Sequence, residues 1–251
     1  MAWFGLRAHR TLGPSETAQR REQAVALLLV VPLFGPPAAG KTTLTMVLGR
    51  HDGRRVFRLR EHVPHEVLSA TAGSSEQLGW IDDHIVEAAL RDYFRGVADD
   101  PEAHTVLMDN FPGSSNQVGQ LLSVLEEFDP PSRVEAVEVH TDSRTLKQRA
   151  QNRKVCHRCE RDPISDPRLP AIPKPDDIWA CSRCDGVLHP RRGDSPRLLR
   201  ARSQRYQNAA IGIRTAFADW RIEITDLDTT TTIDGATNLL SPLLISRSPV
   251  Q

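Results

Sequence analysis

The feature that most constrains the fold of this chain is the stretch GPPAAGKT at residues 35–42, which matches the pattern G-x-x-x-x-G-K-[ST]. A short apolar run, residues 27–34, comes directly before it and is typical of a buried parallel strand. After it, Leu44, Val47 and Leu48 recur at helical spacing. A glycine-rich turn between a buried strand and a helix presents backbone N–H groups, and the positive end of the helix, to an anion. The pattern therefore indicates an α/β fold with a phosphate-binding loop after its first strand.

The residue types in this loop are suited to a nucleoside triphosphate. Gly35 and Gly40 let the backbone curl round the phosphates with no side chain in the way. Lys41 adds a positive charge for the terminal phosphates, and the hydroxyl of Thr42 is placed for Mg²⁺. The alternative, a chance match in a turn, is disfavoured by the strand and helix patterns on either side. The predicted ligands of ATP and Mg²⁺ are Gly35, Pro36, Ala38, Ala39, Gly40, Lys41, Thr42, Thr43 and Asp109.

Composition and charge argue against several classes of protein. The 251 residues are 39% hydrophobic and 25% charged, which is ordinary for a soluble protein, and this length allows one large α/β domain or two small ones. Lys and Arg together number 32, as do Asp and Glu, so no net field would attract nucleic acid or an anionic membrane. The apolar run at residues 24–34 is shorter than the roughly 20 residues that span a bilayer. We interpret residues 1–23 as a flexible extension rather than a signal peptide, and we expect a cytoplasmic protein with no membrane partner.

All four cysteines occur in two C-x-x-C pairs. Two such pairs can present four thiolates to one tetrahedral ion, and the site would be structural because four thiolates leave no open coordination position. The intervening residues 160–180 contain five prolines, so this segment is not expected to be helical and needs a metal to fold. The predicted ligands of a structural Zn²⁺ are Cys156, Cys159, Cys181 and Cys184.

Two other interpretations of the cysteine pairs stay open. A redox dithiol or a disulfide would use the same spacing, although a cytosolic setting and the doubled motif disfavour it. A zinc ribbon that binds nucleic acid is the second, because the pairs are surrounded by Arg153, Lys154, Arg158, Arg161 and Arg183. Aromatic residues make up only 5% of the chain, so base-stacking side chains are scarce and a nucleic-acid partner is not expected.

A third stretch, VLMDNFPG at residues 106–113, ends an apolar strand pattern in Asp-x-Phe-Pro, and Gln117 follows it. The glycine-rich loop, this stretch, the two cysteine pairs, and then the sequence RRGD at residues 191–194 with Arg202 occur in one order. That ordered series resembles the adenylate kinase family of nucleoside monophosphate kinases, in the form whose long lid carries a zinc knuckle. The resemblance covers roughly residues 27–244.

The resemblance implies a P-loop NTPase fold, in which a five-stranded parallel sheet is flanked by helices and carries two inserts. One insert would bind the nucleoside monophosphate, and the other would be a zinc-bearing lid over the triphosphate. The apolar pattern favours strands at residues 27–34, 55–59, 104–109, 134–140 and 220–225, and helices at 83–97 and 195–220. The expected division is an extension at 1–23, core at 24–61, 91–152 and 193–245, an acceptor insert at 62–90, the lid at 153–192, and a tail at 246–251.

The resemblance also assigns roles to charged residues. Lys41 matches the lysine that neutralises the transferring phosphoryl group, and Asp109 matches an acidic residue near Mg²⁺, with a capping or turn-forming role as the alternative. Four arginines match those that border the lid and hold phosphates, a task suited to planar guanidinium groups. Two of them, Arg149 and Arg153, are four residues apart and are expected on one helix face. The residues predicted to be catalytic are Lys41, Arg149, Arg153, Arg191 and Arg202.

The chain departs from the family pattern on the acceptor side. Pro64 and Gly113 stand where the family has two arginines that hold the monophosphate, and Gly193 replaces one of two aspartates after the lid. Losing the arginine contacts would weaken phosphate binding, since each charged hydrogen bond contributes about 1.5–3 kcal/mol. Arg58 or Arg60 could compensate from the end of the second strand. The predicted acceptor-binding residues are Gln117, Arg60, Trp80 and Ile81.

The sequence leads to one expected activity and two alternatives. The expectation is a monomeric phosphotransferase that uses ATP and Mg²⁺ and acts on a nucleoside monophosphate or a related small phosphorylated acceptor. One alternative is an adenylate-kinase-like protein that binds ATP as a sensor or scaffold with little catalysis. The other is the zinc-ribbon nucleic-acid binder. Pro64 and Gly113 favour an unusual acceptor, which predicts ATP binding with poor affinity for AMP.

Overall fold

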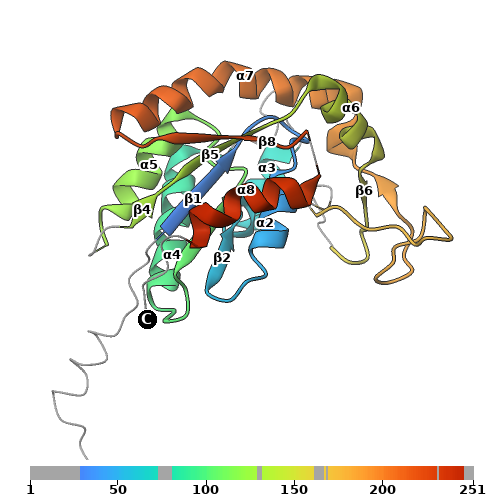
Figure 1. Cartoon of the computed structure of the whole chain (residues 1–251), viewed down its shortest axis with the longest axis horizontal. Coiled ribbons are helices and arrows are strands. Elements are labelled where there is room, and N and C mark those ends of the chain that lie inside the picture. The colour runs from blue at the N-terminus through green and yellow to red at the C-terminus, as the bar shows by residue number, and fades with distance from the viewer. Residues whose placement is uncertain are drawn as a thin grey trace, which may run out of the picture.

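The computed structural model describes residues 29–72, 81–128, 132–160, 167, 169–230 and 232–245. These residues form an α/β structure around a mostly parallel sheet of six strands, with helices on both faces (Figure 1). The main path of the sheet runs β2-β3-β1-β5-β8, and the neighbouring strands on that path pair in parallel. The chain passes from β1 to β2 and β3 on one side of β1, and then to β5 and β8 on its other side. Open α/β sheets bind ligands where the strand order reverses in this way.

The strands are short, and the central ones are buried. β1 is apolar throughout and covered on both faces, as expected for a central parallel strand. The strands are β1 (Leu29–Phe34), β2 (Arg54–Phe57), β3 (Thr105–Asp109), β4 (Arg133–Val134), β5 (Ala136–His140) and β8 (Ile224–Asp228). β4 pairs with the start of β1 and is separated from β5 by Glu135, so the predicted strand at 134–140 is two strands and the sheet has six rather than five.

Helices follow the strands along the chain, as the apolar periodicity predicts. They are α2 (Lys41–Leu48), η1 (Leu59–Glu61), α3 (His65–Ala72), α4 (Asp83–Ala98), α5 (Ser115–Leu125), α6 (Ser143–Asn152), η2 (Arg192–Asp194), α7 (Pro196–Asp219) and α8 (Ile233–Ile245). α4 and α7 confirm the helices predicted at residues 83–97 and 195–220. The strand predicted at 220–225 is displaced toward the C-terminus, because Trp220 caps α7 and Arg221, with a φ of 57°, turns the chain before β8 begins.

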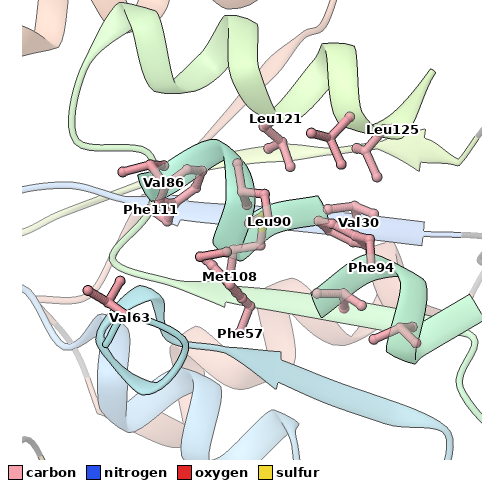
Figure 2. Close-up of a cluster of buried hydrophobic side chains, with 14 of the residues drawn as sticks. Val30, Phe57, Val63, Val86, Leu90, Phe94, Met108, Phe111, Leu121 and Leu125 are labelled. Carbon is pink, nitrogen blue, oxygen red and sulfur yellow. The ribbon is translucent and has the colours of Figure 1, made fainter. Parts of the chain in front are cut away.

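One face of the sheet packs against α4, α5 and α7. The apolar residues of α4 recur every three or four positions, so they form a stripe that faces the sheet. The buried cluster between α4, α5 and the sheet includes Val30, Phe57, Val63, Val86, Leu90, Phe94, Met108, Phe111, Leu121 and Leu125 (Figure 2). Each large apolar side chain in such a cluster contributes roughly 1.5–3 kcal/mol by leaving water. This core holds β2 and β3 in register and so positions the residues that follow them.

The opposite face packs against α2 and α8, and α8 crosses in front of the sheet in Figure 1. Leu44 and Leu48 lie one turn apart on α2 and share a buried cluster with Val31 and Leu33 of β1. Because α2 directly follows residues 35–40, this packing holds the connecting loop at the carboxyl end of β1.

The cysteine-bearing segment, the described part of residues 154–190, lies beside the sheet, to the right in Figure 1. At its base, β6 (Lys154–Val155) and β7 (His189–Pro190) pair antiparallel. The described part of residues 160–180 contains no helix, in agreement with its proline-rich sequence. The buried residues of its small core are Cys156, Cys181 and Leu188.

Candidate functional site

The glycine-rich loop, residues 35–40, connects β1 to α2 at the carboxyl end of the sheet. Gly35 has a φ of 145°, and a Cβ atom there would lie 2.1 Å from the carbonyl oxygen of Val139 on β5, so the position requires glycine. Gly40 has a φ of 98° and is the N-cap of α2, and Ala38 also has a positive φ, of 65°. The loop therefore curls against β5 and ends at the positive pole of a helix.

Lys41 begins α2, and its ammonium group folds back over the loop. The Nζ atom donates hydrogen bonds to the carbonyl oxygens of Gly35, at 2.7 Å, and Pro36, at 2.6 Å. The residue is 5% exposed, and burial lowers the pKa of Lys41 to about 7. Asp109 opposes this shift of the Lys41 pKa, so the carboxylate is close to the ammonium group.

Thr42 and Asp109 meet beside this lysine. Thr42, in the first turn of α2, donates a hydrogen bond from Oγ1 to Oδ1 of Asp109, which ends β3, at 3.1 Å. The other carboxylate oxygen, Oδ2, accepts a hydrogen bond from Nε of Arg58 at 3.1 Å. A hydroxyl and a carboxylate are the hard oxygen donors that Mg²⁺ prefers, so this pair could serve as ligands to Mg²⁺.

Arg149 attaches α6 to the glycine-rich loop. It donates hydrogen bonds to the carbonyl oxygen of Ala39, at 3.4 Å, and to Oγ1 of Thr229, at 3.2 Å. Thr229 follows β8 and is itself buried, and its hydroxyl donates a hydrogen bond to the same Ala39 oxygen at 2.7 Å. Arg153 is the C-cap of α6: its φ of −67° is helical, its backbone N–H donates a hydrogen bond to the carbonyl oxygen of Arg149 at 2.9 Å, and the chain leaves the helix after it, with a ψ of 122°.

Asp194 forms ion pairs with arginines from both ends of the cysteine-bearing segment. Arg153 donates two hydrogen bonds to its carboxylate, each at 2.6 Å, and Arg202 donates from Nη1 to Oδ1 at 3.3 Å. Nη1 of Arg191 lies 3.8 Å from the same Oδ1. The carboxylate is buried, and three positive charges share this one negative charge. Burial, and then the charge of Arg153, lower the pKa of Arg202, and both arginines in turn lower the pKa of Lys41.

We expect Asp194→Asn to lower the free energy of unfolding by about 2–3 kcal/mol, because it removes the buried carboxylate that several arginines share. Breaking a fully buried ion pair usually costs about 3–5 kcal/mol. We expect a smaller loss of stability here because the arginines retain some contact with water. Urea denaturation measures this change. Asp92→Asn is the matched control, because its exposed pair with Arg95 contributes less than about 1 kcal/mol. Equal stability of the two variants would contradict the role given to Asp194.

Two residues predicted to bind the acceptor are buried. Gln117, on α5, accepts a hydrogen bond at Oε1 from the backbone N–H of Gly113 at 2.7 Å, so it supports the turn before the helix and is not a solvated side chain. Ile81 packs in the core cluster of α4 and α5. Trp80 lies outside the described residues. The structure therefore brings Gln117 and Gly113 together, and it joins the start of α4, just after Ile81, to α5 through hydrogen bonds from Asn116 and Gln120 to Asp83.

Arg60, the fourth predicted acceptor residue, lies in η1 at the carboxyl end of β2. Its charge is one of the causes that lower the pKa of Arg202, after burial of that arginine. Pro64 is exposed and its carbonyl oxygen accepts the first hydrogen bonds of α3, so it offers no cationic group. On this side of the sheet, Arg60 is therefore a basic residue whose charge acts on Arg202, a member of the arginine cluster on Asp194.

The four cysteines form a compact cluster. Their sulfur atoms all lie within 4.8 Å of one another, with Sγ–Sγ distances of 3.4 Å for Cys156–Cys184, 3.7 Å for Cys159–Cys181 and 3.2 Å for Cys159–Cys184. A disulfide bond is about 2.05 Å long, whereas the edge of a tetrahedron with Zn–S bonds of about 2.3 Å is about 3.8 Å. The cluster could therefore hold a metal ion such as zinc.

Neither protein-family models nor curated proteins give a match to this chain. Among the described residues, no helix is both long and apolar enough to cross a bilayer.

Sequence reasoning missed the roles of two residues in this region, and both depend on strand order. Arg58 lies beside Asp109 because β2 is the neighbour of β3, with Phe57 paired to Met108. Thr229 reaches Ala39 because β8 follows β5 in the sheet. Each is the first residue after a strand of the structure, but the predicted strands ended at other residues, and the contacts follow only once the strand order is known.

Proposed function

We propose that this protein is an ATP-dependent phosphotransferase that moves the γ-phosphoryl group of ATP to a nucleoside monophosphate or a related small phosphorylated acceptor. The observation that carries the proposal is the positive charge at the carboxyl end of β1, where Lys41 lies on the curled loop with Arg153 and Arg202 close enough to lower its pKa. Phosphoryl transfer depends mainly on positioning and on charge stabilisation, which such a group of cations supplies. The resemblance of the sequence to the adenylate kinase family supports the same function.

In this proposal each cation has a separate task. A triphosphate would lie along the backbone N–H groups of the glycine-rich loop, and Lys41 would turn from its two carbonyl partners toward the terminal phosphates. Arg149 would hold the loop in shape through Ala39. The three arginines on Asp194 would contact the transferred phosphoryl group when the cysteine-bearing segment closes over it. That closure would exclude water and so limit hydrolysis.

Two metal ions belong to the proposal. Mg²⁺ bound with ATP would neutralise phosphate charge, and the Thr42 hydroxyl and Asp109 carboxylate would hold it, since their oxygens already lie 3.1 Å apart. Zn²⁺ in the cysteine cluster would keep the lid segment folded, because that segment has little buried apolar surface of its own.

The acceptor would be recognised differently from the family pattern. Pro64 and Gly113 cannot hold a phosphate by guanidinium contacts, so we assign the anionic group of the acceptor to Arg60. Gln117 would shape the turn beside the acceptor through its bond to Gly113. This arrangement favours an acceptor other than AMP.

Calorimetry with Mg·ATP and a coupled assay with AMP, UMP, CMP, GMP and dTMP test the proposal. Saturable binding of Mg·ATP, with turnover on at least one acceptor, is the expected result. Binding without turnover on any of them would assign the protein to ATP sensors or scaffolds. The absence of binding to well-folded protein would end the proposal.

The affinity for Mg·ATP should fall as the pH rises above about 7, because the free protein then loses the proton of Lys41. Adjacent phosphates raise the pKa of Lys41 back toward its ordinary value of 10.5, so between these two pKa values binding takes up a proton. Below the lower pKa the lysine is already charged and takes up none. Calorimetry in buffers of different ionisation enthalpy, at about pH 6 and about pH 8.5, measures the uptake. Equal uptake at both pH values would contradict the assignment.

A further inference from the structure

Arg58 and Asp109 form a partly buried ion pair at the carboxyl ends of two adjacent strands. The register pairs Phe57 of β2 with Met108 of β3, so the next residues on the two chains are Arg58 and Asp109. Nε of Arg58 lies 3.1 Å from Oδ2 of Asp109, and the two side chains are 17% and 5% exposed. Screening by water is weak at such exposure, so the guanidinium acts strongly on the carboxylate.

The ion pair engages one of the two carboxylate oxygens of Asp109. Asp109 has Oδ1 on the hydroxyl of Thr42 and Oδ2 on Arg58, so both carboxylate oxygens are engaged. A cation that binds between Thr42 and Asp109 therefore meets a carboxylate whose charge is already matched by a neighbouring guanidinium. The cation must then compete with the guanidinium for the same negative charge, and this competition is strong in a partly buried site.

Arg58 also has a second carboxylate within reach. Its Nη1 atom lies 3.6 Å from Oε1 of Glu61, which is on η1 and exposed to solvent. The guanidinium can therefore shift from Asp109 toward Glu61, or toward an anion bound near η1, and still keep an ionic partner.

We propose that Arg58 is a positioning residue that sets the Mg²⁺ affinity of the nucleotide site through its ion pair with Asp109, an inference that rests on the proposed function. While Arg58 holds Asp109, cation binding is weakened. When Arg58 moves to Glu61 or to the anionic group of an acceptor, the Asp109 carboxylate is free to bind the cation. Binding of the acceptor and binding of Mg²⁺ are thereby coupled.

The test is calorimetry of ADP binding with and without Mg²⁺, and the ratio of the two Kd values is the Mg²⁺ enhancement. Arg58→Gln should increase the Mg²⁺ enhancement roughly fivefold to tenfold, because the guanidinium that competes with the cation for the Asp109 carboxylate is removed. Arg58→Lys retains the charge and should stay within about twofold of the wild type. Arg55→Gln is the matched control, since Arg55 is on the same strand but pairs with Asp100, and it should leave the enhancement unchanged.

A double-mutant cycle shows whether Arg58 acts through Asp109. In an Asp109→Asn background, Arg58→Gln should have no further effect on the Mg²⁺ enhancement. Glu61→Gln keeps Arg58 on Asp109 and should lower the enhancement about twofold, and because Glu61 is exposed this variant should fold even where Arg58→Gln does not.

The outcomes separate this inference from the proposed function. If the wild type binds ADP but neither Arg58→Gln nor Glu61→Gln changes the Mg²⁺ enhancement, the inference is overturned and the proposed function stands. An effect of Arg58→Gln that persists in the Asp109→Asn background also overturns it. If the folded wild type binds neither ADP nor ATP at any Mg²⁺ concentration, the proposed function fails and the inference fails with it.

Discussion

Lys41→Met should lower kcat by roughly 10²–10³-fold or more, because it removes the charge that would face the transferring phosphoryl group. The side chain is 5% exposed and lies over the loop that would hold the phosphates. The protein should still fold with methionine at this position. Burial disfavours the charged ammonium group, as the lowered pKa of Lys41 indicates. Replacing it with methionine, which has a similar length, therefore removes a charge that does not stabilise the fold.

The measurement combines a coupled assay on the best acceptor of the wild type with a thermal melt. Lys147→Met, an exposed lysine on α6, is the control and should keep wild-type turnover. Loss of turnover at an unchanged melting temperature separates a role in phosphoryl transfer from a role in folding. Wild-type turnover in Lys41→Met would show that Lys41 does not act on the phosphates.

Cys181→Ser should abolish stoichiometric zinc binding and unfold the cysteine-bearing segment, while the sheet stays folded. Cys181 is buried at the centre of the small cluster, and removal of one thiolate leaves a three-ligand site. Structural zinc sites bind with apparent free energies of about 10–16 kcal/mol, and in small segments that energy is the folding energy. Elemental analysis reports the zinc, and limited proteolysis reports whether the segment is open.

Ser182→Ala is the matched control, because Ser182 is the next residue and its side chain is exposed. It should retain zinc and resist proteolysis as the wild type does. Far-UV circular dichroism of Cys181→Ser should remain close to that of the wild type, since the helices and the parallel sheet lie outside this segment. Wild-type protein that contains no zinc, and whose four thiols react freely, would contradict the metal site.

Much of the sheet could be predicted because each strand and helix has a local signal. The apolar run before Gly35 and the helical spacing after Lys41 place β1 and α2, and α4 and α7 follow from periodicity alone. The errors occur where the local signal is weak. β4 is only two residues long, and the end of α7 depends on the turn at Arg221, which no apolar pattern marks.

The candidate site was predicted less completely, because its contacts join distant parts of the chain. The loop motif is local, so Lys41 and Thr42 could be named from sequence. Asp194 lies in the RRGD stretch noted in the sequence, but its role depends on Arg153, 41 residues before it, and on Arg202, 8 residues after it. Arg58 is similar, because its partner Asp109 is a neighbour across the sheet and not along the chain.

The pairing of Lys154 with Pro190 at the base of the cysteine-bearing segment means that this segment leaves the core and returns to it at one place. Arg153, the residue before Lys154, also donates two hydrogen bonds to Asp194, which comes shortly after Pro190. The segment is thus an insertion whose two ends lie side by side. We expect that its tip can be shortened or exchanged by design without moving the strands of the sheet that precede and follow it.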